Sequence, residues 1–561
     1  MLKTFGIAYL SGFFYLFADR ILKCFQPVQS ELQNPHYTFL YNATSAPLMT
    51  EYDYIIVGGG TAGCPLAATL SQHYSVLLLE RGGSPYGDPM ITDQVNFAAD
   101  LLRDGPLTPS QSFTSEDGVL NQRARVLGGG TCLNAGFFTH ASRPYVRAAG
   151  WDEGLVHDAY RWVEGVVASF PQLGPWQTAV RNGLLEVGIT PDNGRTFEHL
   201  YGTKVGGSIF DHNGHRHTAA NLLEYADPNN LTVLLYATVH RILTHTSSNG
   251  SAHAFGVLYK DLNGVEHQAN LTQRTGSEVI VSAGAMGSPH LLMWSGIGPA
   301  AQLNAFNISV VVDNPNVGQG MRDNPMNALG IPLTQSIEYS AIEVVGIPQT
   351  FGAFIETASM NAANLVSLQV PTALISPCNA SAISLNFDTV TNFAALLQKV
   401  AGPVSNGELK LNGSDFTSPP SVRFNYYSDP EDLRSCVAGT RTMLDVLYSR
   451  ALAPLVTDAI CLPAVLEILY SLTPSGRDDD AEIASFCKRT VRTIWHYHGG
   501  CVVGKVVDAD YRVLGTQALR VIDGSTFVNS PGTNPQATVM MLGRYMGVQI
   551  LKERLSYKGE T

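Results

Sequence analysis

The most regular pattern of apolar and polar positions lies between residues 52 and 80. Two short runs rich in apolar residues, YDYIIV (52–57) and SVLLLE (75–80), enclose a glycine-rich stretch and the segment CPLAATLSQ, whose residues favour a buried helix. Pro65 falls in the first turn of that helix, where a missing N–H costs nothing. The order strand, glycine turn, helix, strand predicts a βαβ unit.

Apolar runs of strand length recur farther along the chain. Strands are predicted over three of them: 231–243, 252–261 and 277–284. The alternation in SVRFNYYS (421–428) suggests antiparallel sheet, within a region (330–490) punctuated by proline and polar residues. Residues 27–50 are polar and irregular, and a helical stretch, VMMLGRYMGVQILKERL, lies near the C-terminal end.

The bulk composition limits the class of protein. A chain of 561 residues is too long for one ordinary core, so two domains are expected. Apolar residues make up 45% and charged residues 15%, which is typical of a chain that buries a large core. The formal net charge is −12 and no Lys/Arg run occurs, so a nucleic-acid partner is not expected.

The first 25 residues have the pattern of a targeting segment. Lys3 precedes the apolar run FGIAYLSGFFYLFA, which is too short to span a bilayer but fits a secretory signal. We therefore expect the secretory pathway (extracellular, cell wall or vacuole) and no stable membrane span. An uncleaved anchor and a buried N-terminal helix stay open as alternatives.

Asparagine and cysteine positions add to this picture. Seven asparagines head an N-x-S/T sequon, which is consistent with a secreted glycoprotein: Asn42, Asn230, Asn249, Asn270, Asn307, Asn379 and Asn412. Eight cysteines without a C-x-x-C pair indicate neither a disulfide-dense scaffold nor structural zinc, so no metal is expected.

The glycine turn has the spacing of a dinucleotide site. Gly58, Gly60 and Gly63 form G-x-G-x-x-G directly after a strand and at the start of a helix. The first glycine permits the turn, the second lets a pyrophosphate approach, and the third lets helix pack on strand. Glu80 ends the second strand, where a carboxylate accepts from a ribose hydroxyl. This motif alone leaves FAD and NAD as alternatives.

Five further stretches resemble one family. ARVLGGGTCLNAG (124–136) and GAMGSPHLLMWSGIG (284–298) resemble the two signatures of the glucose–methanol–choline (GMC) oxidoreductases. The C-terminal stretches WHYHGG (495–500), DGSTF (523–527) and GTNPQAT (532–538) resemble the family's active-site strands. The likeness runs from about residue 50 to 555 and is greatest to the plant branch with HOTHEAD-type and (R)-mandelonitrile lyase-like proteins.

The resemblance implies one tightly held FAD and an α/β fold with an α+β second domain. A Rossmann-like FAD-binding domain would be assembled from several segments, and an antiparallel-sheet domain would bind the substrate. The implied FAD-binding domain comprises residues 48–145, 225–330 and 490–555. The implied substrate-binding domain comprises 146–224 and 331–489.

Carried over by position, the resemblance also names the residues that contact FAD. The ADP half would contact Gly58, Gly60, Thr61, Ala62, Gly63, Glu80 and Arg81. The flavin would be lined by Val126, Thr131, Asn134, Ala135, Gly136 and Phe137, and the adenine would meet Val239. The ring system would be closed by Trp495, Gly524, Pro535 and Gln536.

Two histidines one residue apart are the candidate catalytic groups. His496 aligns with the family's catalytic histidine, and an imidazole that is largely neutral at pH 7 can accept a hydroxyl proton. His498 does not align, so packing is favoured for it, although a role as a second acid stays open. A metal site would need more ligands, and only Cys501 stands nearby. Asn534 occupies the family's second polar position, where it would orient a substrate oxygen.

Two reactions are therefore considered for a small-molecule substrate. The favoured one is FAD-dependent oxidation of an alcohol, with omega-hydroxy fatty acids and aromatic alcohols as plausible substrates. The alternative is (R)-hydroxynitrile lyase activity on a cyanohydrin, with a redox-silent FAD. In the almond-type lyases, by resemblance, a histidine fills the position of Asn534 and a tyrosine that of Ile494, so both departures count against cleavage. A non-catalytic flavoprotein is a third hypothesis, which the intact His–Asn pair disfavours.

The resemblance suggests one disulfide as well. Cys436 and Cys487 stand where relatives of the lyase branch carry a disulfide, and the pairing is conditional on secretion.

Overall fold

The computed structural model describes most of the chain. The described residues are 37–47, 49–246, 250–333, 335–361, 392–413, 415–456, 478–532 and 534–559. The expected targeting segment (1–25) lies outside them, as do Asn249 and Asn379.

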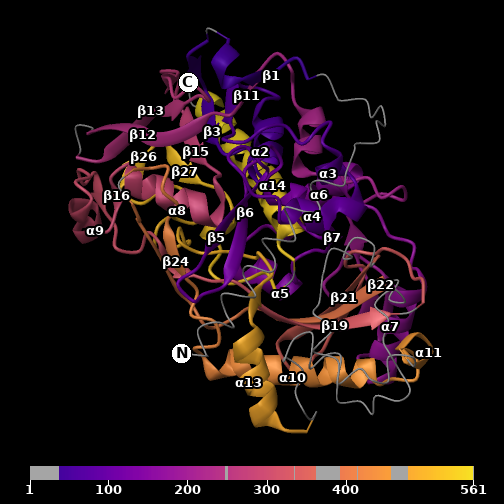
Figure 1. Cartoon of the computed structure of the whole chain (residues 1–561). Coiled ribbons are helices and arrows are strands. Elements are labelled where there is room, and N and C mark those ends of the chain that lie inside the picture. The colour runs from indigo at the N-terminus through magenta and orange to yellow at the C-terminus, as the bar shows by residue number, and fades with distance from the viewer. Residues whose placement is uncertain are drawn as a thin grey trace.

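A six-stranded parallel sheet forms one half of the molecule (Figure 1). Its strands, in spatial order, are β1 (Leu40–Asn42), β11 (Leu231–Leu235), β4 (Val76–Leu79), β3 (Tyr54–Val57), β15 (Glu278–Val281) and β27 (Leu519–Val521). Every residue of β3, β4 and β15 is buried, which explains their unbroken apolar sequence, because both faces of a parallel sheet are covered.

Alternate residues of these strands pack against different layers. Tyr54 and Ile56 of β3 face one cluster, with the helices α2 (Gly63–Leu70), α6 (Glu153–Val167) and α14 (Gln536–Gly559). Ile55 and Val57 face the other cluster, with a second sheet. That sheet consists of β12 (Thr238–Thr246), β13 (Ala252–Lys260), β14 (Glu266–Leu271), β2 (Glu51–Tyr52) and β26 (Thr516–Gln517).

A seven-stranded sheet forms the other half. Its strands, in spatial order, are β25 (Arg492–Thr493), β19 (Pro325–Leu333), β22 (Asn392–Val400), β21 (Ala353–Asn361), β20 (Val344–Ile347), β9 (Gly202–Val205) and β8 (Asp192–Arg195). All neighbours are antiparallel except β8 and β9. Figure 1 shows α10 (Pro430–Leu447) and α13 (Asp480–Thr490) beneath this sheet, and their apolar residues share a core with those of α7 (Pro175–Glu186).

Shorter elements connect the sheets. They are η1 (Ala43–Ser45), α3 (Pro89–Thr92), η2 (Gln94–Asn96), α4 (Phe97–Leu101), β5 (Ser110–Thr114), β6 (Leu120–Ala124), η3 (Gly129–Cys132), β7 (Phe137–Phe138), α5 (Arg143–Ala148), β10 (Gly207–Ser208), η4 (Ala219–Tyr225), α8 (Gly284–Trp294), β16 (Ile297–Gly298), α9 (Ala300–Ala305), β17 (Val312–Asp313), β18 (Gln319–Met321), β23 (Gly407–Lys410), β24 (Ser421–Arg423), α11 (Ala453–Val456) and η9 (Gly524–Thr526). Within the described ranges, none of the helices is both long and apolar enough to cross a membrane.

The predicted fold class is confirmed, because a parallel sheet and a mainly antiparallel sheet are both present. The predicted strand over 231–243 is wrong in one respect: Tyr236, with φ 55°, separates β11 from β12, which belong to different sheets. The lead-in expected to be irregular contains β1, an edge strand of the parallel sheet. In 421–428 only the first three residues pair antiparallel, because Asn425 and Tyr427 have positive φ. The domain boundaries given above stay a prediction.

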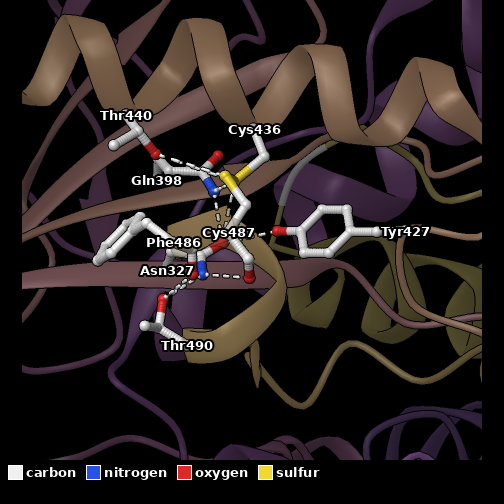
Figure 2. Close-up of a disulfide and its surroundings, with 8 residues drawn as sticks. All are labelled: Asn327, Gln398, Tyr427, Cys436, Thr440, Phe486, Cys487 and Thr490. Atoms are coloured by element: carbon white, nitrogen blue, oxygen red, sulfur yellow. Dashed lines mark hydrogen bonds between the residues drawn. A yellow bond between two sulfur atoms is a disulfide. The ribbon is translucent and has the colours of Figure 1, made fainter. Parts of the chain in front are cut away.

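The predicted disulfide between Cys436 and Cys487 is confirmed. It joins α10 to α13 behind the seven-stranded sheet (Figure 2). Asn327 of β19 lies against it and donates to the carbonyl of Cys487 at 3.0 Å and to Oγ1 of Thr490 at 2.7 Å. The disulfide thus ties α13 to α10, and the hydrogen bonds from Asn327 tie α13, which leads into β25, to the sheet.

Candidate cofactor and active site

A cavity of about 1410 Å³ joins the two halves of the molecule. At one end its wall is formed by Gly58, Glu80 and Ser282, which follow parallel strands, and at the other by Ala328 and Leu397 of the seven-stranded sheet. Open parallel sheets bind ligands at the carboxyl ends of their strands. Because drug-sized sites measure about 300–1,000 Å³, this cavity has room for a dinucleotide and a small substrate together.

Most residues predicted to form the site lie on this wall. They are Gly58, Gly60, Thr61, Ala62, Glu80, Arg81, Val126, Asn134, Ala135, Gly136, Phe137, Val239, Trp495, His496, Gly524, Asn534, Pro535 and Gln536. Gly63, Thr131 and His498 are not on the wall. The Thr131 hydroxyl donates to the carbonyl of Gly128 and accepts from the N–H of Ala219. It therefore stabilises the glycine loop around Gly128 without lining the cavity.

The glycine turn leaves open space where a dinucleotide is expected. Gly58 has φ 105°, and a Cβ there would lie 2.4 Å from the carbonyl oxygen of Ser282. A Cβ on Gly63 would lie 2.0 Å from the carbonyl oxygen of Gly58, so only a glycine lets α2 pack this closely on the turn after β3. At Gly60 the nearest atom would be 3.8 Å away. The backbone of Gly60 therefore borders free space at the N-terminus of α2, whose unpaired N–H groups attract an anion.

Charged side chains surround the same end of the cavity. Glu80 is 6% exposed and accepts from the N–H of Gly59 at 3.0 Å and of Gly82 at 2.8 Å. Burial raises the pKa of its carboxyl, and each oxygen keeps a lone pair for another donor. Arg81 and Arg123 line the wall nearby and both donate to Oε1 of Gln111 at 2.9 Å. Arg123 was not predicted from the sequence.

The opposite wall consists of the loop after β6 and the N-terminus of α14. Nδ2 of Asn134 donates to Oε1 of Gln536 at 2.8 Å, and Nε2 of Gln536 donates to the carbonyl of Phe137 at 2.7 Å. A Cβ on Gly129 would lie 2.8 Å from Cα of Gly60, so the two glycine loops touch backbone to backbone. These residues fit FAD, since the open turn, the anion-binding helix terminus and the volume match its pyrophosphate, ribose and flat ring.

His496 lies where the chain turns sharply into the cavity. Trp495 before it has φ 60°, and its indole N–H donates to Oε1 of Gln122 at 2.7 Å. The main-chain N–H of His496 donates to Oδ1 of Asp323 at 2.9 Å. The residue is 9% exposed, and Nδ1 is buried without a hydrogen-bond partner among the described residues, so Nε2 is the nitrogen that can face the cavity.

Burial, followed by the positive charge of Lys399, lowers the pKa of His496 well below 6.5. The imidazole is therefore neutral near pH 7 and can accept a proton. His498 is buried beside it, and its Nδ1 donates to the carbonyl of His496 at 3.0 Å. Burial lowers the pKa of His498 to about 4, and this geometry supports the packing alternative for it. In the part of the chain that the structure describes, no group of His, Cys, Asp or Glu side chains is placed to hold a metal ion.

Three charged residues beside the site were not predicted. Asp323 accepts from His496, and Lys399 donates to Oδ1 of Asn534 and to Oε1 of Glu356, both at 2.6 Å. Asp323 lies two residues before β19, whereas Lys399 and Glu356 lie on β22 and β21 in the region punctuated by polar residues. No spacing motif connects them, and only the alternation along β22 could have signalled that Lys399 shares a face with Ala395 and Leu397.

Comparison with known proteins gives one consistent family. Models described as GMC oxidoreductase match residues 52–326 and 403–543. Protein HOTHEAD of Arabidopsis thaliana is 48% identical over 91% of this chain and 89% of its own length. The (R)-mandelonitrile lyase-like protein of the same plant is 48% identical over 92% of this chain and 93% of its own length. The sinalpyl alcohol oxidase Nec3 of Nesocodon mauritianus is 45% identical over 91% of this chain and 90% of its own length.

Solved structures agree on the fold. The formate oxidase of Aspergillus oryzae superposes with a TM-score of 0.73 over 91% of this chain and 99% of that chain, at 20% identity.

Proposed function

The chain belongs to the GMC oxidoreductase family, whose members bind FAD, and on that basis we propose that it oxidises an alcohol to a carbonyl compound. Bound FAD supplies the acceptor for the hydride that leaves the carbinol carbon. The chain must then take the hydroxyl proton and hold the substrate oxygen in place.

The observation that supports this reaction best is the joint placement of His496 and Asn534 on the cavity wall. A neutral imidazole at His496 can accept the hydroxyl proton. Oδ1 of Asn534 accepts from Lys399, so its Nδ2 is left to donate to the substrate oxygen. One group removes the proton and the other steadies the oxygen from which it leaves.

The wall over the seven-stranded sheet favours a substrate with an apolar body. Most of its residues come from one face of three strands: Met326, Ala328, Gly330, Ala358, Met360, Ala395 and Leu397. Small residues in the middle of this face leave room above the sheet. We propose aromatic or long-chain alcohols as substrates on this ground, and the name of the Nesocodon relative, an alcohol oxidase, is consistent with it.

The same proposal includes passage through the secretory pathway. A disulfide forms and persists in oxidising compartments, and Cys436–Cys487 is buried. The sequon residues Asn42, Asn307 and Asn412 are exposed, as glycosylation requires.

Hydroxynitrile lyase activity is the second candidate, because one relative at 48% identity is named (R)-mandelonitrile lyase-like. In that reaction His496 would take the hydroxyl proton of a cyanohydrin, and the carbon–carbon bond would break to give an aldehyde and cyanide. Cyanide leaves with the electron pair and can take the proton from His496, but a second positive or acidic group would be needed to steer the departing anion. His498, the candidate second acid, is off the cavity wall, and Asn534 carries no titratable proton. The structure therefore supports oxidation better.

Two parallel incubations of the purified holoenzyme under nitrogen test the proposal. An aromatic or long-chain primary alcohol should bleach the flavin absorbance and yield the aldehyde. With mandelonitrile, prompt release of benzaldehyde and cyanide while the flavin stays oxidised, together with no bleaching by any alcohol, would assign the lyase reaction instead.

A further inference from the structure

Lys399 and Glu356 form an ion pair that is completely enclosed in the protein. Nζ of Lys399 lies 2.6 Å from Oε1 of Glu356, and each side chain is 1% exposed. The same Nζ donates to Oδ1 of Asn534 at 2.6 Å. A buried ion pair adds little to stability, since desolvation offsets much of the attraction, so its placement against the cavity wall calls for another explanation.

We propose that the Lys399–Glu356 pair is a positioning device that fixes the amide of Asn534 with Nδ2 toward the substrate. Lysine has three donors and no acceptor, so only the oxygen of an amide can face it. The amide orientation, which is ambiguous for most asparagines, is therefore determined by chemistry here. This inference rests on the proposed function, in which Asn534 donates to the substrate oxygen.

Glu356 is needed to keep Lys399 charged. Burial lowers the pKa of the lysine, whereas the charge of Glu356 and its hydrogen bond raise it. A neutral amine could accept a hydrogen bond and would then allow the reversed amide. The pair arises from the sheet register: Glu356 lies opposite Leu397, two residues from Lys399, which places the two long side chains diagonally on neighbouring strands.

A second buried lysine supplies a matched control. Lys204 of β9 belongs to the same sheet, is 0% exposed, and donates to Oγ1 of Thr139 and to the carbonyl of Glu198, both at 2.6 Å. It is not on the cavity wall. Loss of this ammonium tests the structural cost of removing a buried lysine without touching Asn534.

The experiment uses the holoenzyme with Lys399 and Glu356 replaced. Because Lys399→Met alone leaves a buried carboxylate unpaired, the double variant Lys399→Met/Glu356→Leu replaces both charges by apolar side chains of similar length. The rate of anaerobic flavin reduction by the best alcohol is measured for wild type, the double variant, Lys204→Met and Asn534→Ala. It is also measured for the triple variant, in which the double variant carries Asn534→Ala as well.

We expect the double variant to retain FAD and its flavin to be reduced roughly 100-fold more slowly, because a misplaced catalytic group causes a loss of that size. Lys204→Met should stay close to wild type. In the Asn534→Ala background the same two substitutions should cost less than about 3-fold, because the group that they position is already absent. An undiminished loss in that background would overturn the inference.

A readout without turnover separates this inference from the proposed function. In a neutron crystal structure of the double variant holoenzyme, which distinguishes the amide nitrogen from the oxygen, the Asn534 amide should be rotated or present in more than one orientation, and an amide placed as in the wild type would overturn the inference. Failure of every alcohol to reduce the wild-type flavin would refute the proposed function, and the amide orientation would still decide the role of Lys399.

Discussion

Asp323 holds His496 through its main chain: Oδ1 of the carboxylate accepts from the N–H of His496 at 2.9 Å. The hydroxyl of Tyr426 donates to the other oxygen at 2.6 Å. Asp323 therefore fixes the backbone just after Trp495, whose positive φ turns the chain toward the cavity. The position of the proposed base thus depends on a residue that does not itself line the cavity.

Stability should depend on pH through Asp323. Burial raises the pKa of its carboxyl to about 6, whereas an unfolded aspartate titrates near 4. Between about pH 4 and pH 6 the folded state binds more protons than the unfolded state. The free energy of unfolding of the wild type should therefore fall relative to that of Asp323→Asn as pH rises, by about 1.4 kcal/mol for each unit by which the folded and unfolded pKa values of Asp323 differ. The measurement is the Tm of both proteins across this range. A Tm difference that moves the other way with pH would contradict the assignment.

The activity profile should reflect the lowered pKa of His496. Because burial and the charge of Lys399 disfavour the imidazolium, the neutral base persists below pH 6.5. A plot of kcat/KM against pH should therefore stay high through pH 6.5 and fall only at lower pH. A half-maximal point at or above 6.5 would show that the imidazole titrates like an exposed histidine.

Alanine substitutions at two glycines of the same turn should have different effects. Gly58→Ala places a Cβ 2.4 Å from a carbonyl oxygen at φ 105°, so we expect poorly folded protein. Gly60→Ala meets no atom closer than 3.8 Å, so the apoprotein should keep its Tm while FAD affinity falls, because the methyl group fills the approach of the pyrophosphate.

Flavin titration of refolded apoprotein, with Tm measured in parallel, checks this pair. Equal FAD affinity in Gly60→Ala and wild type would show that this turn does not contact the cofactor.

Some features of the site could be predicted from the sequence and others could not. The glycine turn and Glu80 could be predicted because they act through backbone geometry and a fixed spacing. Lys399 and Glu356 could not, because buried lysine and glutamate are rare and these two meet only through the register of β21 and β22. The break at Tyr236 was equally hidden, since a tyrosine with positive φ carries no sequence signal.

The disulfide should contribute to stability more than to chemistry. Cys436 and Cys487 are 51 residues apart, and closing a loop of that length contributes about 4 kcal/mol in the chain-entropy model. The double variant Cys436→Ser/Cys487→Ser should therefore unfold at lower urea concentration while its flavin spectrum is retained. An unchanged urea midpoint would mean that α10 and α13 are held together by packing alone.

The most direct test of the account is single-turnover reduction of the bound flavin by the best alcohol under nitrogen, in wild type and His496→Ala. With alcohol deuterated at the carbinol carbon, wild type should bleach several-fold more slowly than with the protiated alcohol, since the carbon–hydrogen bond breaks in that step. His496→Ala should retain yellow FAD and bleach about 100- to 10,000-fold more slowly. Bleaching at the wild-type rate by His496→Ala, or a wild-type flavin that no alcohol bleaches, would contradict the account.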